Sequence, residues 1–261
     1  MTTDNKKMNS IIEKGAEIGG SVAGAAIGLA ILGPVGAIGG AVIAPLVASV
    51  FKKIGNEISE KILSPREEVR IGATYSLALE KIKTEVENGK RIRNDNFYTP
   101  HRGDRSSADM ILEGALLKAR DEYEEKKIKF YSYFLANLNF EASISFEKGN
   151  TLLKIIEKMS YRQIALLGYI EEIKVLDTNN WTVHFTQKED LEPFHDFYSE
   201  LMDLYNQQIL KQVGQFSMMI PAMELSGLGK TLCKLLDTTE IESEDKDIIK
   251  NTIAEINEKI K

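Results

Sequence analysis

The chain has 261 residues, of which 43% are hydrophobic and 28% are charged, and its formal net charge is −6. Such a composition predicts a folded body, long enough for one large domain or two smaller ones. The single cysteine, Cys233, excludes an intramolecular disulfide framework and a cysteine-rich metal site. Residues 151–261 carry 12 basic and 19 acidic side chains, and this acidic balance argues against nucleic acid as a partner.

Residues 18–51 form a run of 34 residues without a charged side chain. As one straight helix the run would extend about 50 Å, more than the roughly 30 Å of a bilayer core. Pro34 and its neighbouring glycines lie at the centre of the run, where they predict a kink or a reversal. We therefore expect a helical hairpin with two arms, residues 18–32 and 37–51, each about 22 Å long.

The glycines of this run recur every four residues. On a helix, such GxxxG spacing makes a smooth groove that a second backbone can approach closely, as in membrane helices. In water each interior glycine costs about 1 kcal/mol relative to alanine, so lipid, the body of the chain or other copies must stabilise the segment. The residues expected to pack in the membrane or in an oligomer are Gly20, Gly24, Gly28, Pro34, Gly36 and Gly40, and Gly15 and Gly19 extend the spacing backwards.

Three interpretations of the run compete. A signal peptide is disfavoured, because the run is too long and follows Glu13 and Glu17. A buried core hairpin, wrapped by later helices, remains open. We favour a membrane-inserting hairpin with both ends on the cytoplasmic side, because lysines flank the run on both sides. These lysines are Lys6, Lys7, Lys14, Lys52 and Lys53.

A helix is predicted over residues 65–88. Ser64 and Glu67 form a capping box around a proline at the first helical position, and Gly89 provides the stop. The following segment, residues 90–107, is a polar loop, either simply solvated or a contact for anionic lipid or nucleic acid. The candidate lipid-contacting cations are Lys52, Lys53, Arg91, Arg93, Arg102 and Arg105.

A helix resumes at Ala108, and its apolar positions follow the 3.6-residue period of a core-facing helix. These positions are Ile111, Leu112, Ala115, Leu116 and Ala119.

From residue 151 the pattern changes. We expect a helix over 151–159, a second helix capped by Ser160, a strand at "WTVHFT" (181–186), and a helix over 191–210. The rest of the chain is expected to form a strand–turn–strand at 211–221, a helix over 224–236 and an amphipathic helix over 244–261. This order resembles a winged-helix module. Glu200 and Asp203 stand where a DNA-reading helix would need basic residues, so we expect a protein partner instead.

A family resemblance is found in the segment "LLKARDEYEEKKIKFYSYFLANLNFEASISFEKGNTLLKIIEKMSYRQIALLGYI". Its charged helix, its "FLANL" step and its closing "SYRQIALL" resemble the abortive-infection alpha family and similar uncharacterised bacterial proteins. The resemblance covers residues 112–236. It implies a bacterial phage-defence or host-arrest role, and it supplies no catalytic residues.

No catalytic, metal or cofactor site is expected. None of the three histidines has a partner at metal-ligand spacing, and "GLGK" at 227–230 lacks the spacing of a phosphate-binding loop. Cys233 lies on an apolar helix face, which indicates a buried structural thiol. The histidines are His101, His184 and His195.

We therefore expect a mainly α protein with three parts: a glycine-zipper hydrophobic segment (1–63), a central helical domain (64–150) and a winged-helix-like α+β module with a C-terminal helix (151–261). The expected function is that of a non-enzymatic, pore-forming defence effector, cytoplasmic and associating with the inner membrane. Its expected partners are membrane lipid, further copies of itself and a triggering protein. The alternative is a soluble adaptor or sensor in which the hairpin is a buried core or an oligomer interface.

Overall fold

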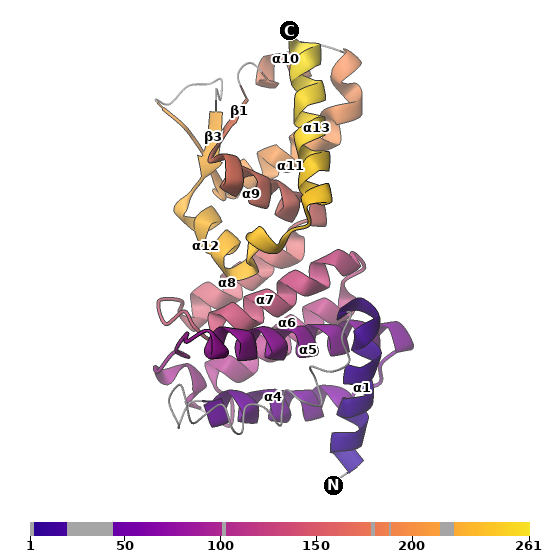
Figure 1. The fold of residues 1–261 in the computed structure, drawn as a ribbon, viewed down its shortest axis with the longest axis vertical. Coiled ribbons are helices and arrows are strands. Elements are labelled where there is room, and N and C mark those ends of the chain that lie inside the picture. Colours follow the sequence, from indigo (N-terminus) through magenta and orange to yellow (C-terminus); the bar gives the residue numbers. More distant parts are fainter. Residues whose placement is uncertain (1–2, 20–43, 101–102, 179–180, 188, 215–221) are drawn as a thin grey trace. The chain divides into compact units, whose positions relative to one another are not determined.

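The computed structural model describes residues 3–19, 44–100, 103–178, 181–187, 189–214 and 222–261 (Figure 1). In this described part the chain forms 11 α-helices and one three-stranded antiparallel sheet, and 76% of it is helical. The expectation of a mainly α protein is confirmed. The chain divides into two compact units, Met1–Lys158 and Met159–Lys261. The helices on both sides of the apolar run thus belong to the same unit as the central helices.

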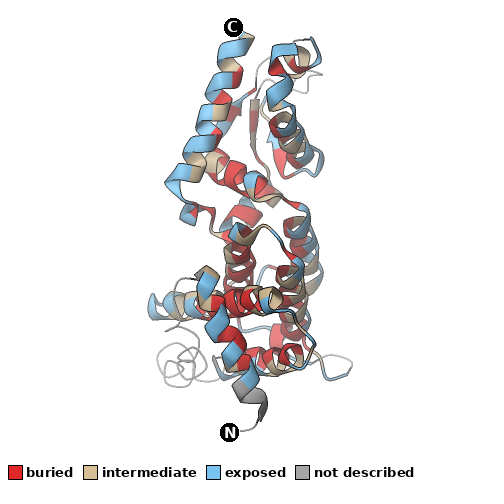
Figure 2. Cartoon of the chain, turned by 90° about the vertical axis from the view of Figure 1, so that its right-hand side faces the viewer, coloured by how far each residue is buried: buried red, intermediate tan, exposed pale blue. Residues whose placement is uncertain are grey.

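The first unit is a bundle built around one long helix, α5. Helices α1, α6 and α7 pack against α5, while α4 packs against α6 and α1, and α8 packs against α6. Most of these helices carry both buried and exposed residues (Figure 2), whereas α7 has no exposed residue. The elements are α1 (Thr3–Gly19), α4 (Ala44–Ser59), α5 (Pro65–Glu87), η1 (Asn96–Tyr98), α6 (Ser107–Asp121), η2 (Glu125–Lys127), α7 (Ile128–Leu138) and α8 (Phe146–Lys158).

The predicted bounds of α5 are confirmed. The Ser64 hydroxyl accepts a hydrogen bond from the Glu67 backbone N–H, and the Glu67 carboxylate accepts one from the Ser64 N–H, which completes the capping box. Gly89 follows the helix with φ +87°, a left-handed conformation that glycine adopts without steric cost. All five apolar positions predicted to face the core from α6 are buried.

The second unit combines a small sheet with helices. Strand order is β1-β3-β2, both pairings are antiparallel, and Glu224 of β3 lies opposite Val175 on one side and Lys211 on the other. The elements are α9 (Tyr161–Ile173), β1 (Val175–Asp177), α10 (Trp181–Gln187), η3 (Glu189–Phe194), α11 (His195–Asn206), β2 (Leu210–Gln212), β3 (Ala222–Leu225), α12 (Gly227–Leu236), η4 (Thr238–Glu240) and α13 (Ser243–Ile260).

One strand prediction is wrong. The segment 181–186 belongs to helix α10, because its two large side chains that are buried, Trp181 and Phe185, are four residues apart and share one helical face. Strand β1 was not predicted, since three residues are too few to show alternation. The expected hairpin is present with its strands at 210–212 and 222–225, displaced outward from 211–221. The Ser160 cap of α9 is confirmed.

Candidate functional site

The six residues expected to pack in the membrane, Gly20, Gly24, Gly28, Pro34, Gly36 and Gly40, lie outside the described residues. What the structure describes is the pair of helices on either side. The expected second arm ran to Phe51, but residues 44–51 begin helix α4, where Val47 and Phe51 are buried in the first unit. The charge-free part between the two helices is therefore residues 20–43. No helix in the described ranges is both long enough and apolar enough to cross a bilayer.

Helix α1 crosses α5 at a backbone-to-backbone contact. A Cβ atom added to Gly15 would lie 2.2 Å from the Ala73 nitrogen, and one added to Gly72 would lie 1.9 Å from the Ile11 carbonyl oxygen. Real Cβ contacts are never this short, so only glycine fits at both positions. Gly15 extends the four-residue glycine spacing of the apolar run, and here that spacing allows close packing within the protein itself.

Among its described side chains, α1 also contributes a small apolar cluster and two surface ion pairs. Met8, Ile11 and Ile12 are buried. Full burial contributes about 1.5–3 kcal/mol for each such side chain. Helix α4 has five large apolar side chains that are buried. These are Val47, Val50, Phe51, Ile54 and Ile58.

The ion pairs of α1 lie toward its C-terminal end. Lys14 pairs with Glu68, and Glu17 pairs with Arg66, which also bonds Glu125. These hydrogen bonds raise the pKa of Arg66 above its usual value, with Glu125 the larger cause. The pairs are exposed to solvent, so their main effect is to fix the position of α1 on α5 rather than to stabilise it strongly.

Both helices that flank segment 20–43 contact neighbouring positions of α5: Gly15 of α1 lies against Gly72 and Ala73, and Phe51 of α4 lies against Tyr75. The Glu17 side chain near the end of α1 pairs with Arg66, and Phe51 of α4 packs edge-on against Tyr75, with ring centroids 5.2 Å apart.

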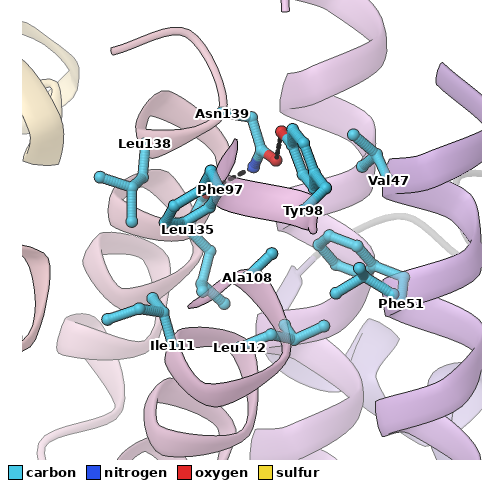
Figure 3. Close-up of a pocket in the computed structure, with 11 residues that line it drawn as sticks. Val47, Phe51, Phe97, Tyr98, Ala108, Ile111, Leu112, Leu135, Leu138 and Asn139 are labelled. Atoms are coloured by element: carbon cyan, nitrogen blue, oxygen red, sulfur yellow. Dashed lines mark hydrogen bonds between the residues drawn. The ribbon is translucent and has the colours of Figure 1, made fainter. Parts of the chain in front are cut away.

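A small apolar hollow lies beside α4 (Figure 3). Val47 and Phe51 line it from α4, and Leu112 lines it from α6, while Tyr98 and Asn139 provide its polar edge. The Tyr98 hydroxyl donates to Asn139 Oδ1 at 2.6 Å, and burial raises the pKa of Tyr98, so the phenol remains a donor. The cavity volume is about 20 Å³, room for about one water molecule. The hollow is thus a packing defect rather than a ligand pocket.

The candidate lipid-contacting cations differ in their surroundings. Lys52 and Arg91 are exposed, whereas Lys53 binds the Asp109 carboxylate at 3.1 Å. Arg105 bridges Glu57 of α4 and Glu113 of α6, at 2.5 and 2.8 Å. Lys53 and Arg105 thus both connect α4 to the α6 region, and Arg102 lies outside the described residues.

Arg93, in contrast, is an interior residue, with a side chain only 2% exposed. Its guanidinium bonds both carboxylate oxygens of Asp95, at 2.9 and 2.5 Å, and the Ile144 carbonyl at 3.0 Å. It also stacks on the Phe97 ring, 4.1 Å from the centroid. The Arg93 bond holds the pKa of Asp95 below its usual value. Arg93 therefore anchors residues 90–98 to the body, and lipid has no access to it in this conformation.

Two polar features were not singled out from the sequence. In the first unit, Lys127 and Glu122 form a buried ion pair at 2.5 Å, to which the Tyr131 hydroxyl also donates. In the second unit, a hollow of about 330 Å³ is lined by Lys174 and Lys230 together with two glutamates. The glutamates, Glu171 and Glu224, are already bonded, to Thr238 and Lys211 respectively. Neither feature has a recognised sequence signature.

The chemistry-bearing residues of the second unit lie apart. Cys233 is buried, as predicted, and burial raises the pKa of its thiol to about 12. His184 lies on α10, His195 begins α11, and His101 lies outside the described residues. Among the described residues, no group of three or more histidine, cysteine, aspartate or glutamate side chains is placed to hold a metal ion.

Comparison of the chain with protein-family models, with curated proteins and with solved structures found no match.

Proposed function

We propose that this chain is a bacterial phage-defence protein of the abortive-infection type that acts on the inner membrane through segment 20–43. The observation that carries the proposal is the setting of this segment. It has 24 residues without charge and with four-residue glycine spacing, and both flanking helices belong to one compact unit. Two ends held by one unit stay on the same side of a bilayer, as expected of a re-entrant or hairpin insertion.

In this mechanism, the protein rests in the cytoplasm until a trigger acts. The uncharged segment then leaves water for lipid, which is favourable in proportion to the apolar area transferred. Its glycines allow segments from several copies to pack closely and to permeabilise the membrane. The defence role itself rests on the resemblance of residues 112–236 to the abortive-infection alpha family.

The second unit is proposed to be winged-helix-like and to receive the trigger. Its element order, helix–strand–helix–helix–strand–strand, and its sheet order β1-β3-β2 support this assignment. The helix in the position of a recognition helix is α11, which carries Asp196, Glu200 and Asp203 and no lysine or arginine. Such a helix repels phosphate, so the proposed partner is a protein rather than nucleic acid.

The alternative function, a soluble adaptor or sensor, also has an observation in its favour. The helices bordering the apolar segment contribute to the core of the first unit, Ile11 from α1 and Ile54 from α4 among others. In this alternative, segment 20–43 would continue that core or form an interface between copies, and the second unit would bind a protein partner.

One replacement separates the two functions. Deleting residues 1–51 would also remove buried side chains of α1 and α4 and would destabilise the unit. The sharper variant keeps both helices and replaces residues 20–43 with a glycine–serine–asparagine linker of equal length. The measurements are cell fractionation, growth, and survival of the culture under phage challenge, for the natural chain and for the linker variant.

The membrane-active function requires that the natural chain enters the membrane fraction and arrests growth, at rest or after phage infection, and that the linker variant does neither. The membrane function is wrong if the linker variant still protects the culture, or if the natural chain stays out of the membrane fraction throughout infection. Either result would favour the adaptor function.

A further inference from the structure

The hollow of about 330 Å³ in the second unit is large enough for a small organic molecule. It lies where helix α9, strand β3 and helix α12 pack against one another (Figure 1). Its apolar lining includes Ile170 and Leu225, which are both buried. Because one water molecule occupies about 30 Å³ of liquid, the hollow has room for more than a single inorganic ion.

The two glutamates that line the hollow are already engaged. Glu224 pairs with Lys211 of the neighbouring strand at 2.8 Å. This hydrogen bond, and more weakly the charge of a second lysine nearby, holds the pKa of Glu224 below its usual value. Glu171 accepts a hydrogen bond from the hydroxyl of Thr238. The glutamates therefore do not bind the remaining cations of the hollow directly.

Those remaining cations are Lys174 and Lys230. Both are exposed, and neither forms an ion pair or a side-chain hydrogen bond with another residue of the described ranges. A phosphate monoester carries a charge of about −1.5 to −2 at pH 7, which matches two such cations. Lysine binds phosphate as a point charge, whereas the planar carboxylate group is better matched by arginine. The charge of the hollow thus fits a single phosphate group.

Lys174 reaches this position through an unusual backbone conformation. It ends α9 with φ +70° and ψ −44°, which residues other than glycine rarely adopt. Glycine commonly ends a helix in this way, because it has no Cβ to create strain. The turn does not require a lysine, so what Lys174 contributes is its charged side chain at the hollow.

We propose that this hollow binds a small organic phosphate monoester, whose phosphate pairs with Lys174 and Lys230 and whose organic part lies on the apolar lining. The Glu171 carboxylate disfavours a second anionic group, so the ligand carries one phosphate rather than a polyphosphate. This inference goes beyond the proposed function and does not depend on it, because no residue of the second unit takes part in the proposed membrane insertion.

The test is calorimetric titration of the full-length protein at low ionic strength with AMP and with phenyl phosphate. Adenosine and inorganic phosphate are the controls, since each carries only one half of the ligand. We expect both monoesters to bind at least about tenfold more tightly than either control, because only they reach the lysines and the apolar lining together. ATP should bind no more tightly than AMP.

Variants locate the site. Replacing Lys174 and Lys230 with glutamine should weaken AMP binding about tenfold for each lysine, the effect of losing one charge-assisted hydrogen bond. The matched control replaces Lys250 and Lys261, two exposed lysines of the second unit outside the hollow, and removes the same charge. This control should bind AMP as the natural chain does.

A third variant, Lys174→Gly, separates ligand binding from a structural role. It removes the side chain and relieves the backbone strain. We therefore expect it to keep or raise the midpoint of thermal unfolding of the second unit, followed by Trp181 fluorescence, while AMP binding weakens about tenfold. A lower midpoint with unchanged AMP binding would show that Lys174 is structural and would overturn the inference.

Four other results would overturn it. The first is no binding of either monoester at millimolar concentration. The second is binding of adenosine or inorganic phosphate as tight as that of AMP, since one half of the ligand would then not be recognised. The third is much tighter binding of ATP than of AMP. The fourth is an equal loss of affinity in the control that lacks Lys250 and Lys261, which would indicate diffuse attraction of anions instead of a site.

Discussion

Replacement of Arg93 by methionine separates a structural role from a lipid-binding role. The side chain is 2% exposed and holds Asp95, the Ile144 carbonyl and, at 3.4 Å, the Leu138 carbonyl. Methionine has a similar stem without the guanidinium, so the packing volume is largely kept while these partners are left unbonded.

The expected cost follows from these contacts. Removing one partner of a buried charge pair costs about 3–5 kcal/mol, because the other charge is left uncompensated. The Asp95 side chain is 35% exposed, so water can restore part of its solvation and the lower figure applies. We expect the free energy of unfolding of the first unit to fall by about 3 kcal/mol. For a unit of this size, the midpoint of thermal unfolding falls by about 6–12 °C.

The assay uses two signals. Circular dichroism reports helices of both units, whereas fluorescence of Trp181, the single tryptophan, reports the second unit. Arg93→Met should lower the midpoint of thermal unfolding of the first unit. The midpoint followed by tryptophan fluorescence should stay unchanged. Arg91→Met is the control, because Arg91 is exposed, and its effect should stay within about 0.5 kcal/mol.

The same variant has a defined pH dependence. Arg93 lowers the pKa of Asp95 in the folded state, so the stability from this pair is fully present above the unfolded pKa of about 3.9. It is lost as the pH falls through the lower, folded pKa. The difference in the free energy of unfolding between the natural chain and Arg93→Met should therefore become smaller at acidic pH. A loss of less than about 1 kcal/mol at neutral pH, or weaker vesicle binding with unchanged stability, would refute the structural role.

Three further predictions concern buried groups. The Tyr75 hydroxyl finds no hydrogen-bond partner among the described residues, so Tyr75→Phe should leave stability unchanged or raise it by up to about 1 kcal/mol in urea unfolding; a clear loss would reveal a hidden partner. Lys127→Met should cost about 3–5 kcal/mol, because Glu122 stays buried without its cation, and adding Glu122→Leu should recover most of the loss; an equally unstable double variant would contradict the ion-pair explanation. Burial raises the pKa of Cys233 to about 12, so a disulfide reagent at pH 8 should modify this thiol only after unfolding, and rapid modification of the folded chain would show that the site is open.

The sequence allowed prediction wherever local chemistry decides the structure. The capping box at Ser64 and the cap at Ser160 need only residues three positions apart, and the core face of α6 follows from its period. Strand β1 and helix α10 could not be predicted in this way, since both are short and depend on tertiary packing. Trp181, for example, is fixed by donating a hydrogen bond to Asn257 of α13, far along the chain.

In the candidate site, too, some features could be predicted from the sequence and others depend on the fold. Composition identified the charge-free run but not its limits, because Val47 and Phe51 read equally well as membrane-facing and as core residues. Arg93 and Arg91 are also indistinguishable by composition, yet one is buried and one is exposed. The difference arises from the Leu138 and Ile144 carbonyls, which the fold brings to Arg93 from more than 40 residues away.

Gly15 belongs to the glycine series of the sequence and also contacts α5 in the fold. A glycine spaced for helix packing can serve a lipid-embedded partner or a partner within the protein, and spacing alone does not choose between them. Here Gly15 meets Gly72, so at least one glycine of the series serves the protein in its described conformation.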